Sequence, residues 1–152
     1  ARRPWKQRLL FFREFFLPAI REIVDAVHAK GAFCIKHCCG NINLILDEMV
    51  GSGIDALHPF DATAGMDLGA VKQRFPHLVV MGGVDCGPVL SEYPVPGVIS
   101  EVKRLLRAAS PAGRYIISST NTIHHTVRPE NYAAMLSTVK EFGRYPVTAS
   151  QF

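Results

Sequence analysis

The 152-residue chain contains 48% hydrophobic and 20% charged residues, which predicts one globular unit large enough to bury a core and excludes a disordered protein. Its 17 Lys and Arg against 13 Asp and Glu give a net charge of +4, which suits an anionic small-molecule substrate. The basic residues are spread along the chain apart from Arg2, Arg3, Lys6 and Arg8, and that cluster lacks the sustained run of a nucleic-acid site, so we expect no nucleic-acid partner.

The cysteines indicate the compartment. Four cysteines, two of them adjacent, form no visible disulfide framework, which is typical of a reducing environment. The sequence shows no signal-peptide pattern and no apolar run of membrane-spanning length. We therefore expect a cytoplasmic protein without a membrane partner. Because the chain begins at Ala1 rather than Met, we also expect it to be a fragment or a processed product.

The pattern of apolar residues divides the chain into three parts. They are residues 1–12, an N-terminal extension or fragment remnant with a weak amphipathic pattern, residues 13–146, the domain, and residues 147–152, a tail. From Leu17 onward, apolar residues at helical spacing predict a helix that ends at Gly31. A strand over 32–37 follows it.

Strands and helices alternate along the rest of the domain. Asn41 and Asp67 are predicted N-caps of two helices, because a short polar side chain accepts a hydrogen bond from a first-turn N–H. Pro129 suits the first turn of the last helix. In chain order we predict a helix from Asn41 to about residue 50, a strand over 54–58, a helix from Asp67 to residue 75, a strand over 78–81, a helix over 96–109, a strand over 115–119 and a helix from Pro129 to Gly143.

The predicted strands lack polar alternation, and each is followed by a helix. This order favours an α/β fold with a parallel sheet that is covered by helices. Two architectures satisfy it: an open doubly wound sheet, or consecutive strands of an eight-stranded TIM (β/α)8 barrel. Periodicity alone leaves both open.

Each predicted strand ends in polar or reactive residues. The carboxyl ends of parallel strands meet at one edge, where ligands bind, so four such clusters predict a single functional site. For His58 and Asp85 a second interpretation stays open, namely a capping or turn-forming residue. The clusters are His37 with Cys39, His58 with Asp61, Asp85 with Cys86, and Ser119, Thr120 and Asn121 with His124.

The first cluster contains an H-x-C pair. Successive side chains of a strand point to opposite faces, so His37 and Cys39 project to one side and Cys38 to the other. Imidazole and thiolate are ligands that zinc prefers, and a catalytic zinc takes about three protein ligands and one open position. The pair is therefore either half of a metal site or a strand-end histidine beside two small buried thiols.

Five blocks of sequence carry a family likeness. They are FFLP at 15–18, HCCGN at 37–41, GIDALHP at 53–59, GGVD at 82–85 and RPENYAAM at 128–135. In consistent order, they resemble the C-terminal half of the uroporphyrinogen decarboxylase superfamily, which also contains corrinoid- and coenzyme-M-linked methyltransferases. The resemblance runs from about Phe12 to Pro146. It implies a partial TIM barrel, with the last four strands and helices of an (α/β)8 fold.

The resemblance also implies a metal site. In the methyltransferase branch the H-x-C pair binds zinc, and a cysteine at the end of the last strand is the third ligand. His37 and Cys39 match the first two ligands, and Asn121, a poor zinc ligand, stands at the third position. In the decarboxylase branch that position holds a histidine, and the essential aspartate and arginines lie in the N-terminal half. Candidates for the missing donor are Asp61, Asp85, Cys86 and a substrate atom.

The H-x-C pair favours the methyltransferase branch, so we predict zinc-assisted, corrinoid-linked methylation of a thiol. The alternatives are decarboxylation of uroporphyrinogen in porphyrin biosynthesis and, in another class, a non-catalytic half-barrel or assembly module. Predicted partners are a small-molecule substrate, a corrinoid protein, and either a missing N-terminal half-barrel or a second copy that covers the open sheet edges. The predicted site comprises the metal ligands His37 and Cys39, the catalytic residues Asp85, Asn121 and His58, and the substrate-binding residues Asp61, Ser119, His124 and Arg128.

Overall fold

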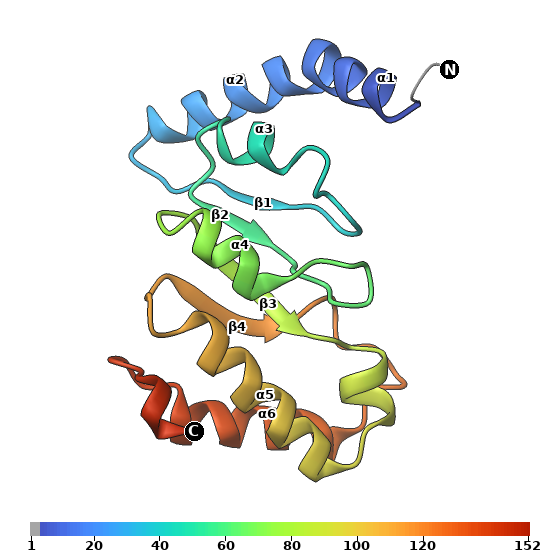
Figure 1. Ribbon diagram of the computed structural model, residues 1–152, viewed down its shortest axis with the longest axis vertical. Helices are drawn as coiled ribbons and strands as arrows, with labels where there is room; N and C mark the ends of the chain where they lie inside the picture. The colour runs from blue at the N-terminus through green and yellow to red at the C-terminus, as the bar shows by residue number, and fades with distance from the viewer. Residues whose placement is uncertain (1–3) are drawn as a thin grey trace.

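The computed structural model describes residues 4–152, and its centre is a parallel sheet of four strands that lie side by side in chain order (Figure 1). The strands are β1 (Ile35–His37), β2 (Ala56–His58), β3 (Val79–Val84) and β4 (Tyr115–Ser119). In the register, Leu57 of β2 stands between Lys36 of β1 and Val80 of β3. The four predicted strands are confirmed, although β1 and β2 begin later than predicted and β3 runs on to Val84.

Helices precede the sheet, connect its strands and follow its last strand. They are α1 (Pro4–Phe11), the π-helical turn η1 (Phe12–Phe16), α2 (Leu17–His28), α3 (Leu46–Val50), α4 (Leu68–Arg74), the π-helical turn η2 (Pro88–Glu92), α5 (Val95–Ala109), α6 (Pro129–Phe142) and the 3-10 turn η3 (Ala149–Gln151). The first three follow one another without a break before β1 (Figure 1). No helix within residues 4–152 is long and apolar enough to cross a membrane.

The helix predicted to begin at Asn41 starts five residues later, and that prediction of a cap was wrong. Asn41 Oδ1 accepts a hydrogen bond from the Asn43 N–H (3.1 Å), which closes a local turn, and the residue that precedes α3 is Ile45. Short polar side chains can bond nearby backbone in turns as well as at caps, and here the turn prevails. At α4 the expected cap is present, since Asp67 Oδ1 accepts from the Ala70 N–H (3.0 Å).

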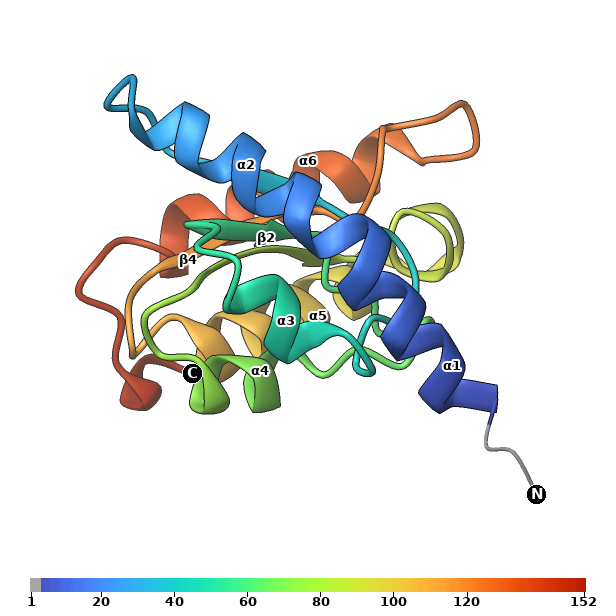
Figure 2. The same cartoon turned by 90° about the horizontal axis from the view of Figure 1, so that it is seen from above.

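Helices α3, α4 and α5 lie on the same face of the sheet (Figures 1 and 2). Right-handed crossovers between neighbouring strands return on the same side, so consecutive strand order with the connecting helices on one face is the pattern of a (β/α)8 barrel. A doubly wound sheet would reverse its strand order and carry helices on both faces. The chain therefore forms part of a TIM-barrel-like fold.

The two faces of the sheet differ in burial. On the helix side, Leu57 and Val80 are completely buried in the core. On the other side, Ile35 and Ile116 expose 56% and 48% of their surface, and together with Phe33 they line an open cavity of about 590 Å³. In a complete barrel this face is the interior, which side chains fill. The apolar face is thus left open by residues 4–152.

Asp55 ties the first two strands to the preceding helix. Its carboxylate accepts hydrogen bonds from the Cys34 backbone N–H (2.7 Å) and from His28 Nε2 (2.8 Å). These bonds, the backbone one foremost, hold the pKa of Asp55 below its ordinary value of 3.8. Because the folded state takes up this proton less readily than the unfolded chain, Asp55 stabilises the fold above the ordinary pKa. That stabilisation is lost as the pH falls through the lowered folded-state pKa.

We therefore expect the free energy of unfolding of the wild-type chain to fall more steeply than that of Asp55→Asn between about pH 5 and pH 2. The asparagine keeps the shape of the side chain and removes the titrating carboxylate. Urea unfolding at a series of pH values measures the difference. Asp25→Asn, at an exposed position on α2, is the control and should follow the wild type. Parallel curves for Asp55→Asn and the wild type would contradict this role of Asp55.

Candidate functional site

Two histidines stand side by side at the carboxyl ends of β1 and β2. His37 and His58 are partners in the strand register, and Leu57 points into the core, so both histidines lie on the face away from the helices. His58 Nδ1 is 2.8 Å from His37 Nδ1. The parallel register thus joins two residues that are 21 positions apart in the sequence.

Cys39 lies close to His37 in the turn after β1. Its Sγ is 3.0 Å from His37 Nε2, and the residue is exposed. Cys38 instead packs against the core, and its N–H donates to the His58 carbonyl (2.7 Å). The alternation of a strand thus continues past the end of β1, so that His37 and Cys39 share one side.

The end of β4 completes this group of residues. The Ser119 carbonyl lies 3.2 Å from His58 Nε2, while the Ser119 hydroxyl donates to the Asn121 carbonyl (2.8 Å). The Asn121 amide donates to Cys39 Sγ over 3.9 Å, and its Oδ1 accepts from the Thr122 N–H. We call these five residues the strand-end cluster: His37, Cys39, His58, Ser119 and Asn121.

Cys86, just after β3, holds the loop that carries Asn121. Its buried thiol donates to the Asn121 carbonyl (3.2 Å) and accepts from the Asn121 N–H (3.1 Å). Its own N–H donates to Thr120 Oγ1 (3.4 Å). Cys86 therefore positions Asn121 through the backbone. The only sequence signal for this residue was its place at a strand end, which does not separate a structural thiol from a metal ligand.

Three predicted substrate-binding residues make their hydrogen bonds elsewhere. Asp61 accepts from the N–H and the hydroxyl of Thr63, at 2.9 and 2.7 Å, in a tight turn. His124 Nδ1 is 2.9 Å from Thr126 Oγ1, and Arg128 is the exposed residue that precedes α6. Within the described part of the chain, none of the three is hydrogen-bonded to the strand-end cluster. Their contact with a substrate stays a prediction.

Asp85 is buried after β3, with 9% of its surface exposed. Its Oδ1 accepts from the Gly87 N–H (2.7 Å), and this bond is the one expected of a turn-forming residue. Its Oδ2 is buried without a hydrogen-bond partner among residues 4–152. A buried acceptor that is left unpaired costs about 1–3 kcal/mol, and more when it is charged. Asp85 thus retains a free acceptor at the edge where ligands bind in this fold.

The strand-end cluster offers two metal donors. No three His, Cys, Asp or Glu side chains within residues 4–152 lie close enough together to hold a metal ion. His37 Nε2 and Cys39 Sγ, 3.0 Å apart, fit two corners of a tetrahedral zinc site after a small opening, since an N and an S ligand of one zinc are about 3.5 Å apart. His58 Nδ1 faces the other nitrogen of His37, and Asn121 presents its NH₂ group to the sulfur. The remaining zinc ligands would therefore come from a substrate or from outside the described residues.

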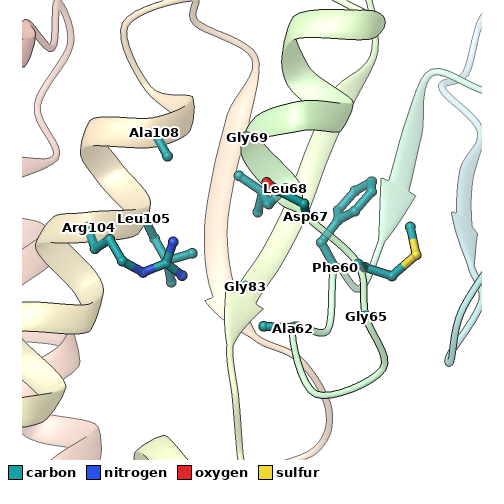
Figure 3. A pocket seen from close by; sticks show the side chains of 11 residues that line it. Phe60, Ala62, Gly65, Asp67, Leu68, Gly69, Gly83, Arg104, Leu105 and Ala108 are labelled. Carbon is teal, nitrogen blue, oxygen red and sulfur yellow. The ribbon is translucent and has the colours of Figure 1, made fainter. Parts of the chain in front are cut away.

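A separate cavity of about 360 Å³ lies between α4 and α5, on the helix side of β3 (Figure 3). Leu68 and Leu105 line it on either side of Gly83, where a Cβ atom would approach them within 3.1 and 3.2 Å. The Arg104 guanidinium at this cavity is paired with both carboxylate oxygens of Glu101 at 2.7 Å. Since the strand-end histidines lie on the other face of the sheet, this cavity is not part of the strand-end cluster.

A solved structure shares the fold of this chain, and a family model identifies its family. A methyltransferase from Methanosarcina mazei has the same fold, with a TM-score of 0.73 and 22% sequence identity, over 88% of this chain and 37% of the methyltransferase chain. This chain thus matches well under half the length of that protein. No curated protein sequence matches it. The family model for uroporphyrinogen decarboxylase (URO-D) matches residues 10–142, so the chain belongs to the uroporphyrinogen decarboxylase family.

Proposed function

We propose that this chain carries part of the site of a zinc-assisted, corrinoid-linked enzyme that methylates a thiol. The proposal depends on one observation, the pair of His37 Nε2 and Cys39 Sγ, 3.0 Å apart at the carboxyl edge of the sheet. Imidazole and thiolate are donors that zinc prefers, and methylation of a thiol has a use for such a metal. Membership of the URO-D family and the fold shared with a methanogen methyltransferase support this choice.

His37 and Cys39 hold the metal in this proposal, and the substrate thiol takes an open position. When bound, zinc lowers the pKa of a coordinated thiol, so that the sulfur is a thiolate at neutral pH. The Asn121 amide donates to Cys39 Sγ and stabilises the negative charge of the metal-bound thiolate. In this proposal the bound metal would supply the thiolate form of the substrate, and a corrinoid held by a partner protein would supply the methyl group.

Residues at the same edge contact the rest of the substrate. Asp85 supplies a free carboxylate oxygen. The exposed His124 lies in the loop after β4, and the exposed, cationic Arg128 ends that loop just before α6. Asp61 lies in the loop after β2. We propose the substrate to be a small molecule with an anionic group, since Arg128 and the net charge of the chain favour one.

Partners complete the site. The chain corresponds to 37% of the methanogen methyltransferase chain, and its open sheet face lacks packing partners among residues 4–152. We propose that an N-terminal half-barrel, or a second copy of this chain, covers this face and supplies the remaining groups. A corrinoid protein delivers the methyl group in the same proposal.

The isolated chain is expected to associate in solution, because the open face exposes Phe33 (84%), Ile35 and Ile116. Ile116→Lys places a charge on this face and should shift the chain toward monomer. Leu136→Lys, at an apolar position of α6 with 42% of its surface exposed, is the matched control and should not. Size-exclusion chromatography with light scattering measures the mass. A wild-type monomer with a cooperative melt would contradict the expectation.

The proposed function is tested by zinc content and by methyl transfer. We expect the purified full chain to hold about one equivalent of zinc by elemental analysis. The zinc-loaded chain should form a thioether from methylcobalamin and 2-mercaptoethanesulfonate, and a chelator should stop the reaction. A folded chain that binds no zinc would contradict the metal site. A zinc-loaded chain, shown to form a closed barrel, that transfers no methyl group would contradict the activity.

A second candidate, decarboxylation of the uroporphyrinogen type, is favoured by the lack of a third metal donor within residues 4–152. Such chemistry needs cations for several substrate carboxylates and no metal. By sequence the candidates are Arg128, Lys36 and the strand-end histidines, but the register places Lys36 beside Leu57, on the side of the sheet away from those histidines. Loss of carbon dioxide from uroporphyrinogen by a metal-free chain would support it. If the folded chain shows neither reaction, the third alternative, a non-catalytic half-barrel or assembly module, gains support.

A further inference from the structure

A continuous line of polar contacts runs through the strand-end cluster. It begins at the Ser119 carbonyl, 3.2 Å from His58 Nε2. It passes from His58 Nδ1 to His37 Nδ1 over 2.8 Å and ends at Cys39 Sγ, 3.0 Å from His37 Nε2. All four ring nitrogens are engaged. Since every hydrogen bond needs one donor and one acceptor, the line restricts where the protons lie.

The Ser119 carbonyl decides the positions of these protons. A carbonyl oxygen only accepts, so His58 Nε2 must carry a hydrogen to bond to it. A neutral imidazole has one N–H, which makes His58 Nδ1 an acceptor and His37 Nδ1 the donor to it. His37 Nε2 is then left with its lone pair, and this lone pair faces Cys39 Sγ.

We propose that His58 is a positioning residue that holds His37 in the Nδ1–H form and presents the Nε2 lone pair to a metal beside Cys39. The part of this inference that concerns the metal rests on the proposed function. A histidine that ligates a metal usually donates its other N–H to a carbonyl, carboxylate or water, and this bond fixes the ring and its tautomer. Here a second histidine, held by the backbone of β4, takes that place.

The alternative tautomer explains why the positioning matters. In the Nε2–H form of His37, a hydrogen occupies the position where the metal has to bind, so that His37 cannot ligate it. A role of His58 that is only structural, as a tie between β2 and β4, would leave the tautomer of His37 without a preference. The tautomer is therefore the readout that separates the two roles.

The first test measures the tautomer in the metal-free wild-type chain. Long-range ¹⁵N–¹H correlation NMR at about pH 8, where an ordinary imidazole is neutral, assigns the protonated ring nitrogen of each histidine. We expect His37 as Nδ1–H and His58 as Nε2–H. A predominant Nε2–H form of His37 would overturn the inference, whatever happens to any variant.

The second test uses variants of His58 and binding of Co²⁺, with its thiolate absorption as the signal. His58→Phe keeps a ring and removes both nitrogens, so we expect it to lose the His37 preference and to bind Co²⁺ about 10–100-fold more weakly. His58→Asn keeps an acceptor near the position of Nδ1 and should recover part of the affinity. His77→Phe, at an exposed histidine before β3, is the control and should match the wild type.

Each outcome distinguishes this inference from the proposed function. Unchanged Co²⁺ affinity and tautomer in a folded His58→Phe chain would overturn the role of His58. If that variant does not fold, the wild-type tautomer and His58→Asn decide the question. The expected tautomer and Co²⁺ affinities in a chain without methyl transfer would leave the positioning role intact and count only against the activity.

Discussion

Cys39→Ala is expected to abolish zinc binding by the chain, whereas Cys38→Ala is expected to leave it intact. Cys39 Sγ lies 3.0 Å from His37 Nε2 on the exposed side, while Cys38 packs against the core on the other side. Loss of Cys39 removes one of the two metal-binding side chains of the strand-end cluster. We therefore expect the affinity for zinc to fall by about 100-fold or more in this variant.

The two cysteine variants control for each other, because each turns a CH₂–SH side chain into a methyl group at adjacent positions. Elemental analysis gives the zinc content of each purified chain, and a Co²⁺ titration gives the affinity. Cys38→Ala should instead lower the free energy of unfolding, by about 1 kcal/mol, since it removes a partly buried sulfur from the core. Equal loss of metal in both variants would contradict the alternation of side chains on which the proposed metal site depends.

Gly83→Ala is expected to destabilise the fold by about 3 kcal/mol or more. Gly83 has φ +99°, a backbone conformation that costs an L residue about 1–2 kcal/mol or more. A Cβ atom there would also approach the Tyr115 hydroxyl, Leu68 and Leu105 within 3.0, 3.1 and 3.2 Å. Forcing an extra methyl into such a packed site typically costs a further 1–3 kcal/mol.

Gly113→Ala is the matched control for this prediction. Gly113 also has a positive φ, +68°, but a Cβ atom there would meet no atom within 4 Å. This variant should lose only the conformational part, about 1 kcal/mol. Urea unfolding curves of the three chains measure the difference. Similar losses of unfolding free energy in both variants would contradict the prediction, because they would show that the close approach of α4 and α5 to Gly83 adds no cost.

The elements of the fold were largely predictable from local patterns. The strands 54–58, 78–81 and 115–119 are apolar runs, and Asp67 and Pro129 mark helix starts that the structure also has. The start of α3 was not predictable in this way, because the Asn41 side chain accepts a hydrogen bond from the backbone of its own turn instead of capping the helix. Residues 4–11 are helical, although their apolar pattern is weak.

The choice of architecture needed more than periodicity. Apolar strands followed by helices fit both a doubly wound sheet and a barrel, and only the consecutive order β1-β2-β3-β4, with the connecting helices α3, α4 and α5 on one face, separates them. The family resemblance anticipated this result, since a match in order along most of the chain carries the topology with it. Strand order depends on contacts between distant segments, to which a local pattern is insensitive.

For the candidate site, the sequence alone determined the H-x-C pair and its two-sided geometry, because alternation along a strand is a local property of the backbone. It also placed the polar residues at one edge of a parallel sheet. Only the tertiary structure decided which of them meet: His58 joins His37, while Asp61 and His124 bond within their own loops. The Ser119 carbonyl contacts His58, 61 positions away, and the Cys86 thiol bonds to Asn121, 35 positions away. The register between the strands brings each of these pairs together.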